Sequence, residues 1–476
     1  MNKLQFFSSI AVLLVCPLAA SGQIDDSTRQ LSRDIFKQLI EINTTDSVGS
    51  TTTAAEAMAK RLRDAGFSEN DIAVIGPNDR KKNLVARLHG TGARKPVLLI
   101  GHLDVVEAKR EDWSTDPFQF VEKDGFFYGR GTQDMKMGDA ILVTTLIRLK
   151  KEGYKPDRDI IVALTADEEG GTANGVDWLL KNHRDLVDAE FVLNHDTDLT
   201  TEHGKLLAFN VDATEKLYAD YQLQVTNPGG HSSIPIPDNA IYHLANGLAR
   251  LARYQFPFEL NNVTRAYYLG MSKVESGQKA ADMKAILRKP PDRAAIARLS
   301  KDRIENSTMR TTCVATTLDA GHARNALPQR AQANVNCRIL PGDTSEETRQ
   351  ILVKVLADPK ISVRWIDREG KPQERGSDQQ SYPPPKLLPE VFKPLQEVVN
   401  QLWPGVPVVP DMSTGASDAV YTNAAGLPTY AVAGTSVDRD DVRAHGKDER
   451  LRVDSFYQGV DFYYRFLKAV TASGSQ

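Results

Sequence analysis

Acidic and imidazole side chains follow three apolar segments of the sequence, at the positions where each segment is expected to end. They are His102 and Asp104 after residues 97–100, Asp167, Glu168 and Glu169 after 160–166, and His195, Asp196 and Asp198 after 191–194. Three consecutive acids at the end of a buried segment repel one another and lose hydration, a cost that a cation or a solvent-facing loop must offset. Carboxylate oxygens and imidazole nitrogens together suit zinc or a similar divalent ion.

Two further residues could complete a pair of metal sites. Asp134 follows Gly129 and Gly131, which permit a close backbone approach, and it opens a helical pattern, so a helix N-cap is the alternative interpretation. His445 lies in the polar loop 441–446, after the apolar segment 428–432.

His102 and Asp104 are two residues apart at the end of an expected strand, where side chains i and i+2 point the same way. We therefore expect the Asp104 carboxylate to accept the second N–H of His102 and to fix its tautomer, as carboxylates do for metal-bound imidazoles.

The elements that would position these residues alternate between helices and apolar strands from about residue 26 to 215. This alternation predicts an α/β catalytic domain with a mostly parallel sheet covered by helices, and ligands of such sheets bind at the strand ends. After Glu215 the pattern becomes β-α-β-β-α-β, which is typical of a ferredoxin-like α+β domain. We expect the catalytic domain at 23–215 and 386–476, the inserted domain at 216–368 and a linker at 369–385. Residues 256–310 form an extended insertion without an assigned role.

The N-terminus has a basic start at Lys3, a short apolar run at 10–15 and small residues at 19–22. This pattern predicts a cleaved signal peptide over residues 1–22, and hence a secreted or periplasmic protein. A lipoprotein anchor at Cys16 and a buried N-terminal helix are the alternatives. The net charge of −3 offers no general attraction for nucleic acid, and no later segment is apolar enough to span a membrane.

Two cysteines, Cys313 and Cys337, remain after the signal peptide, on strands expected at 311–318 and 332–339. If Leu318 pairs with Gln332 in an antiparallel hairpin, Cys313 lies opposite Cys337, at a separation that a disulfide can bridge. An oxidising compartment would permit the bond, and two buried free thiols are the alternative.

The ordered set of motifs resembles the M20 metallopeptidases, a family that includes carboxypeptidase G2-like enzymes, aminoacylase-1 and succinyl-diaminopimelate desuccinylase. The motifs occur in the family's order across nearly the whole mature chain, at residues 101–106, 116–118, 128–136, 165–169, 230–233, 325–328, 338–342, 417–419 and 444–446.

The resemblance implies a role for each matching position. Asp134 would bridge two divalent ions, with His102 and Asp196 completing one site and Glu169 and His445 the other. Glu168 would be the general base for the metal-bridging water. The inserted domain would be a lid and dimerisation domain, whose His231 reaches the partner subunit's site and stabilises the oxyanion. Asn325 and Arg338 would hold the substrate's carboxylate.

The sequence departs from the family at residues 195–198, where the family commonly has a glutamate. Asp196 fits best when counted from the strand, and His195 or Asp198 is the alternative ligand.

The expected function is therefore a two-metal hydrolase, with zinc as the expected metal, that cuts a peptide or amide bond beside a carboxylate. An exopeptidase (carboxypeptidase or dipeptidase) acting as a homodimer is the leading interpretation, and an N-acyl amino acid hydrolase is the alternative. A catalytically inert, metal-containing dimeric binding protein is the alternative from another class.

Overall fold

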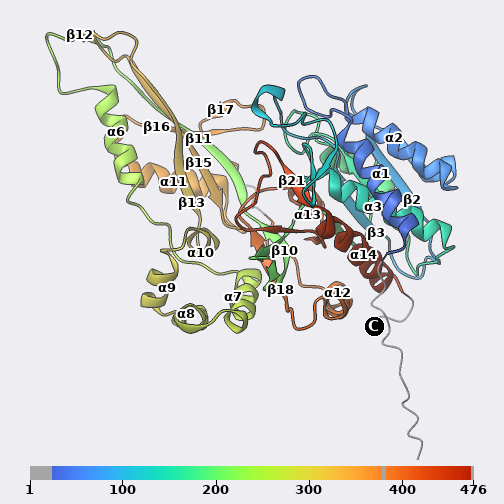
Figure 1. Ribbon diagram of the computed structural model, residues 1–476. Coiled ribbons are helices and arrows are strands. Elements are labelled where there is room, and N and C mark those ends of the chain that lie inside the picture. Colours follow the sequence, from blue (N-terminus) through green and yellow to red (C-terminus); the bar gives the residue numbers. More distant parts are fainter. Residues whose placement is uncertain (1–23, 378–381, 473–476) are drawn as a thin grey trace, which may run out of the picture.

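The computed structural model describes residues 24–377 and 382–472, which form two large sheets with their helices, three smaller sheets and a helical insertion (Figure 1). The predicted signal peptide at 1–22 lies outside the described residues. Among the residues that were described, no helix is both long enough and apolar enough to cross a membrane.

The larger sheet has eight strands in the order β1-β2-β6-β3-β7-β19-β10-β18. The strands are β1 (Ile72–Ile75), β2 (Asn83–Leu88), β3 (Val97–His102), β6 (Ile160–Thr165), β7 (Phe191–Asn194), β10 (Phe209–Glu215), β18 (Val408–Ser413) and β19 (Thr429–Ala431). The central strands β6, β3, β7 and β19 run parallel, and so do β10 and β18, whereas β1–β2, β2–β6 and β10–β19 are antiparallel. The sheet is thus mixed, with its parallel part in the middle.

Helices cover both faces of this sheet because its central strands are apolar on both sides. Val97 and Leu99 of β3 pack into the core under one set of helices, and Leu98 and Ile100 pack into the core under the other. The first set comprises α1 (Asp26–Ile40), α2 (Thr51–Asp64), α3 (Lys136–Lys151), α12 (Pro389–Leu402) and α14 (Val453–Val470). The second comprises α4 (Gly175–Asn182), α5 (Arg184–Val187) and α13 (Ala419–Ala424).

Two small three-stranded sheets lie beside the larger one. One contains β20 (Ser436–Asp438), β8 (Leu199–Glu202) and β9 (Lys205–Leu206), and the other contains β21 (Arg450–Arg452), β5 (Phe126–Tyr128) and β4 (Val121–Lys123).

The inserted domain has the predicted β-α-β-β-α-β order. Its elements are β11 (Leu217–Thr226), α6 (Ala240–Leu251), β13 (Thr312–Ala320), β15 (Arg330–Ile339), α11 (Ser345–Leu356) and β16 (Ser362–Ile366). The sheet order is β13-β15-β11-β16-β17, with α6 and α11 packed on the apolar face of the strands. The fifth strand, β17 (Pro372–Gln373), pairs with β16 inside the stretch that we expected to be a linker.

The insertion after α6 is helical, with α7 (Asn262–Val274), α8 (Gly277–Ile286), α9 (Arg293–Leu299) and α10 (Arg303–Thr308). It leaves and rejoins the inserted domain, yet α7 packs on β18, the edge strand of the larger sheet (Figure 1). Tyr268 of α7 and Val409 of β18 are buried in one apolar cluster, and Gly270 lets the helix approach Val409 closely.

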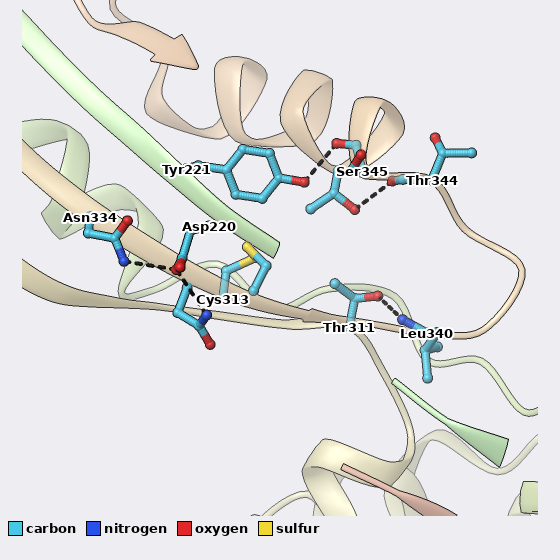
Figure 2. Close-up of a disulfide and its surroundings, with 11 residues drawn as sticks. Asp220, Tyr221, Thr311, Cys313, Asn334, Leu340, Thr344 and Ser345 are labelled. Atoms are coloured by element: carbon cyan, nitrogen blue, oxygen red, sulfur yellow. Dashed lines mark hydrogen bonds between the residues drawn. A yellow bond between two sulfur atoms is a disulfide. The ribbon is translucent and has the colours of Figure 1, made fainter. Parts of the chain in front are cut away.

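A disulfide joins Cys313 of β13 to Cys337 of β15, as predicted (Figure 2). The two cysteines are opposed in the register, but the strand-end pairing from which we predicted this is wrong, because Leu318 pairs with Ala333. A bulge between Ala315 and Thr317 shifts the register by one residue beyond the cysteines.

Candidate metal centre

Three neighbouring parallel strands deliver four of the predicted site residues to one edge of the larger sheet. His102 is the last residue of β3, Glu168 and Glu169 follow β6, and Asp196 follows β7. Because parallel strands end at the same edge, these side chains gather there, as the sequence predicted.

Two groups of three side chains could each hold a metal ion, and they share Asp134. In the first group, Asp134 Oδ1 lies 3.1 Å from His102 Nε2, and Asp196 completes the set. In the second, His445 Nε2 lies 3.1 Å from Asp134 Oδ2 and 2.9 Å from Glu169 Oε1. Asp134 thus presents one carboxylate oxygen to each group. It does not cap α3, whose N-cap residue is Met135.

The donor sets fit divalent ions such as zinc. Within each group, one ligand atom from each residue lies within 4.8 Å of the others. Ligand atoms that share one zinc ion at about 2.0–2.2 Å are roughly 3–4 Å apart, so small adjustments would place an ion among them. Each group also combines imidazole nitrogen with carboxylate oxygen, a mixture that zinc accepts.

Neighbouring carboxylates raise the pKa of both histidines in the two groups. Hydrogen bonds to Asp134 and Glu169 raise the pKa of His445 to about 10. Burial lowers the pKa of His102, but the hydrogen bond to Asp134 and the charges of Glu168 and Asp196 outweigh it and raise that pKa well above its ordinary value. A divalent ion bound by these imidazoles would compete with protons, because imidazole binds a metal in its neutral form.

Burial acts strongly on the carboxyl groups of Glu168 and Asp196 at this edge. Burial and neighbouring carboxylates raise the pKa of Glu168 to about 10, and the charge of His102 opposes the rise. Burial and the charge of Asp134 raise the pKa of Asp196 to about 7. A nearby cation reverses this situation, because it favours the ionised carboxylate.

Asp104 does not have the predicted contact with His102. His102 Nδ1 lies 3.0 Å from the backbone oxygen of Asp104, whereas the nearest carboxylate oxygen is 3.8 Å away. The carboxylate instead accepts the backbone N–H groups of Glu168 and Glu169, at 3.2 and 2.9 Å. The period-two argument fails because β3 ends at His102, so Asp104 lies beyond the pleated strand. Asp104 orients the loop that carries both glutamates.

Lys81 was missed in the sequence, where the cluster Arg80-Lys81-Lys82 was interpreted as solvated charge. Its side chain is 8% exposed and forms ion pairs with Asp46 and with Asp167, which is 2% exposed. Asp167 has a positive φ of 57° directly before Glu168, and its second oxygen accepts the N–H of Ala173. Lys81 thus helps to fix the loop that carries Glu168 and Glu169.

The structure distinguishes between the three residues after β7 that are candidate metal ligands. His195 turns into the core, where its ring packs on Tyr463 with centroids 4.9 Å apart. Asp198 accepts a hydrogen bond from Thr435 Oγ1 at 2.6 Å. Asp196 alone of the three joins a metal-binding group of the described residues.

The inserted domain holds its three predicted site residues at two separate places. His231 is on β12 (Gly230–His231) at the tip of this domain, far from the larger sheet of the same chain (Figure 1). Asn325 lies beside it, because its backbone oxygen accepts the N–H of Ser232 and β14 (Ala326–Leu327) pairs with β12.

Arg338 is on β15, at the opposite end of the inserted sheet. Its guanidinium packs over the ring of Tyr218 at 4.7 Å, and Nη1 is buried without a hydrogen-bond partner among the described residues. Within one chain, Arg338 and Asn325 therefore lie at opposite ends of the inserted sheet.

Residues 98–469 match the model of peptidase family M20/M25/M40. The chain is 28% identical over 384 residues to "Probable carboxypeptidase S-like 2" of Dictyostelium discoideum, covering 79% of this chain and 71% of that one. It is 27% identical over 466 residues to the human "N-fatty-acyl-amino acid synthase/hydrolase PM20D1", covering 94% and 89%.

Among solved structures, the fold is similar to that of the M20 family metallo-carboxypeptidase Sso-CP2 from Sulfolobus solfataricus. The TM-score is 0.66 at 17% sequence identity, covering 94% of this chain and all of the other. The chain is a hydrolase and belongs to peptidase family M20/M25/M40.

Proposed function

We propose that this protein is a two-metal exopeptidase, with zinc as the metal, that cuts a peptide bond next to a free carboxylate. The observation that carries the proposal is the position of Asp134, which offers one carboxylate oxygen to His102 and the other to His445. Family membership supports hydrolysis of this class of bond.

Glu168 has the position that a general base needs. It follows β6 directly, next to the ligand Glu169, and it is close enough to His102 and Asp196 for their charges to affect its pKa. Bound divalent ions would lower the pKa of a water molecule and polarise the substrate's carbonyl group. Glu168 would take the proton of the attacking water and return it to the leaving amine.

Arg338 is the residue that we propose for binding the substrate's carboxylate. Its buried Nη1 has no hydrogen-bond partner among the described residues, and a guanidinium pairs well with a carboxylate. Lys216, which is also buried, lies close enough to Arg338 that burial and this charge lower its pKa to about 7. An anion between the two domains would relieve this repulsion.

We also propose a homodimer in which His231 and Asn325 complete the site of the partner subunit. The separation of these residues from the metal ligands of their own chain supports this arrangement. A histidine there could donate a hydrogen bond to the oxygen that becomes negative during attack.

A second candidate function is hydrolysis of N-acyl amino acids. Three large apolar side chains, Ile234, Ile236 and Tyr242, follow His231 and are 73%, 42% and 61% exposed. If this segment closes over a substrate, it favours an apolar acyl group. Two of the similar proteins have names that refer to a carboxypeptidase and to a fatty-acyl amino acid hydrolase, so both substrate classes occur among relatives.

The decisive experiment is a substrate panel tested with zinc-loaded and chelator-treated protein. The panel contains free dipeptides, N-blocked dipeptides, N-acyl amino acids of different chain lengths, and a C-terminal amide of each as the matched control. We expect activity that needs metal and a free carboxylate, with dipeptides or blocked dipeptides preferred. Preference for long acyl groups would favour the second candidate. Stoichiometric metal binding without hydrolysis of any compound would favour an inert binding protein.

We propose that the protein is exported after removal of residues 1–22. The basic and apolar pattern of the N-terminus and the disulfide between Cys313 and Cys337 support this location. N-terminal sequencing of the mature protein should begin at Gln23, and an intact N-terminus would contradict the proposal.

A further inference from the structure

Two loops that carry candidate metal ligands lie at the same end of a short pair of strands. β5 leads into the loop 129–135 with Asp134, and β21 follows the loop 441–449 with His445. The strands are paired, with Tyr128 opposite Arg450, so the loops begin side by side. Neither ligand lies on a strand or helix, and His445 is 55% exposed. Something other than regular secondary structure must therefore fix their separation.

Glu449 binds the backbone of the opposite loop. Its side chain is fully buried. Oε1 accepts the backbone N–H groups of Gln133 at 2.6 Å and of Asp134 at 3.1 Å. Oε2 accepts the backbone N–H of Gly131 at 3.2 Å and a guanidinium N–H of Arg130 at 2.6 Å. The carboxylate of one loop thus holds the other loop at four points, one of which is the amide of the bridging ligand.

Gln133 makes the reciprocal contact. Its Oε1 accepts the backbone N–H groups of Arg443 at 2.8 Å and Ala444 at 2.9 Å, directly before His445. Its Nε2 donates to the backbone oxygens of Asp441 at 3.2 Å and Arg450 at 2.8 Å. The amide group therefore uses all four of its hydrogen-bonding positions, three on the loop that carries His445 and one on Arg450, the first residue of β21.

We propose that Glu449 and Gln133 form a reciprocal lock that sets the spacing between the metal ligands Asp134 and His445. The proposal rests on the proposed function. Both are positioning residues, since each acts through the backbone beside a ligand. Partners that orient metal ligands in this way change metal affinity by about 10–100-fold when they are lost.

Two substitutions break the lock from opposite sides. Glu449→Gln places an NH₂ group against backbone N–H groups or against Arg130, so two donors face each other. Gln133→Met keeps the length of the side chain and removes its four hydrogen bonds. The matched control is Glu346→Gln in the inserted domain. Glu346 is also buried and accepts N–H groups from Arg349 and from the backbone of Gly376, but it lies far from the metal ligands in the fold.

The experiment measures Zn²⁺ binding to the full-length mature protein by calorimetry and by competition with a chromophoric chelator. We expect the wild type to bind two ions per chain, and Glu449→Gln and Gln133→Met each to weaken binding about 10–100-fold. The double variant should bind Zn²⁺ only slightly more weakly than either single variant, because each single substitution already disrupts the contact between the two loops. Glu346→Gln should lower the unfolding midpoint and leave Zn²⁺ affinity unchanged, which separates positioning from general stability.

The outcomes distinguish this inference from the proposed function. If the wild type binds no Zn²⁺, the proposed metal centre is wrong, and the lock has no ligand to position. If the wild type binds two ions and the folded variants bind them with unchanged affinity, the metal centre stands and the lock is wrong. Gln133→Met changes no charge, and it keeps the test decisive if Glu449→Gln does not fold.

Discussion

Breaking the disulfide between Cys313 and Cys337 should destabilise the inserted domain. The size of the effect depends on the length of the loop that the bond closes. The bond closes a loop with a sequence separation of 24. The chain-entropy relation for such a loop gives about 3.5 kcal/mol at 25 °C. The bond ties the edge strand β13 to its neighbour β15, so the loss should appear in unfolding of that sheet (Figure 2).

Two variants separate the bond from the packing of its sulfur atoms. Cys313 lies at a half-buried position, whereas Cys337 is fully buried in the core of the inserted domain. Cys313→Ala therefore breaks the bond without opening a cavity at Cys337, and it should cost close to 3.5 kcal/mol. The double variant Cys313→Ala/Cys337→Ala should cost somewhat more, because it also removes a buried sulfur.

Urea denaturation of the full-length mature protein measures this loss. Trp365 on β16 belongs to the same sheet, so tryptophan fluorescence includes a reporter of its unfolding. Thiol titration of denatured, unreduced wild type should find no free thiol in the mature chain. Two free thiols, or a Cys313→Ala variant as stable as wild type, would refute the reasoning.

Four further predictions concern the site. Glu168→Gln should keep two Zn²⁺ ions per chain, as metal analysis would verify, and lose about 10²–10⁴-fold in kcat because the proton acceptor is gone. Lys81→Met should lower the free energy of unfolding by about 3–5 kcal/mol, because Asp167 is left buried and unpaired; Lys81→Met/Asp167→Asn should recover much of this in the same denaturation assay. Chelator-treated protein should lose stability as the pH rises from about 6.5 to about 10, because the raised pKa of His445 stabilises the fold while the imidazole is charged; a flat thermal-denaturation profile over that range would contradict this. Co-expressed His231→Ala and Glu168→Gln chains should form heterodimers with partial activity, and inactive purified heterodimers would argue against shared sites.

Three of the candidate metal ligands could be predicted from the sequence because they follow strongly apolar strands. A strand that is buried on both faces leaves a clear hydrophobic run, and the edge at which it ends follows from parallel topology. His102, Glu169 and Asp196 are all of this kind. Asp134 and His445 lie on loops, where the sequence indicated them only as candidates, and their grouping with the other ligands depended on the family resemblance.

The supporting residues could not be predicted because their surroundings come from distant parts of the chain. The buried Lys81 side chain is paired with Asp167, which is 86 positions away in the sequence. Glu449 and Gln133 are more than 300 positions apart. Neither pair leaves a periodic pattern, and a polar side chain in a loop is usually solvated. The register beyond the bulge could not be predicted either, because no sequence pattern marks the extra residue near Thr316.

The packing of α7 on β18 has a mechanical consequence for the whole molecule. The inserted domain joins the catalytic sheet through two chain connections, which by themselves would act as a free pivot. The insertion adds a third attachment, since Tyr268 and Val409 are fully buried there. Swinging the domain outward would expose such side chains, each at about 1.5–3 kcal/mol. The third attachment therefore restricts rotation of the inserted domain relative to the larger sheet. Substrate access should depend on small sliding motions rather than on wide opening.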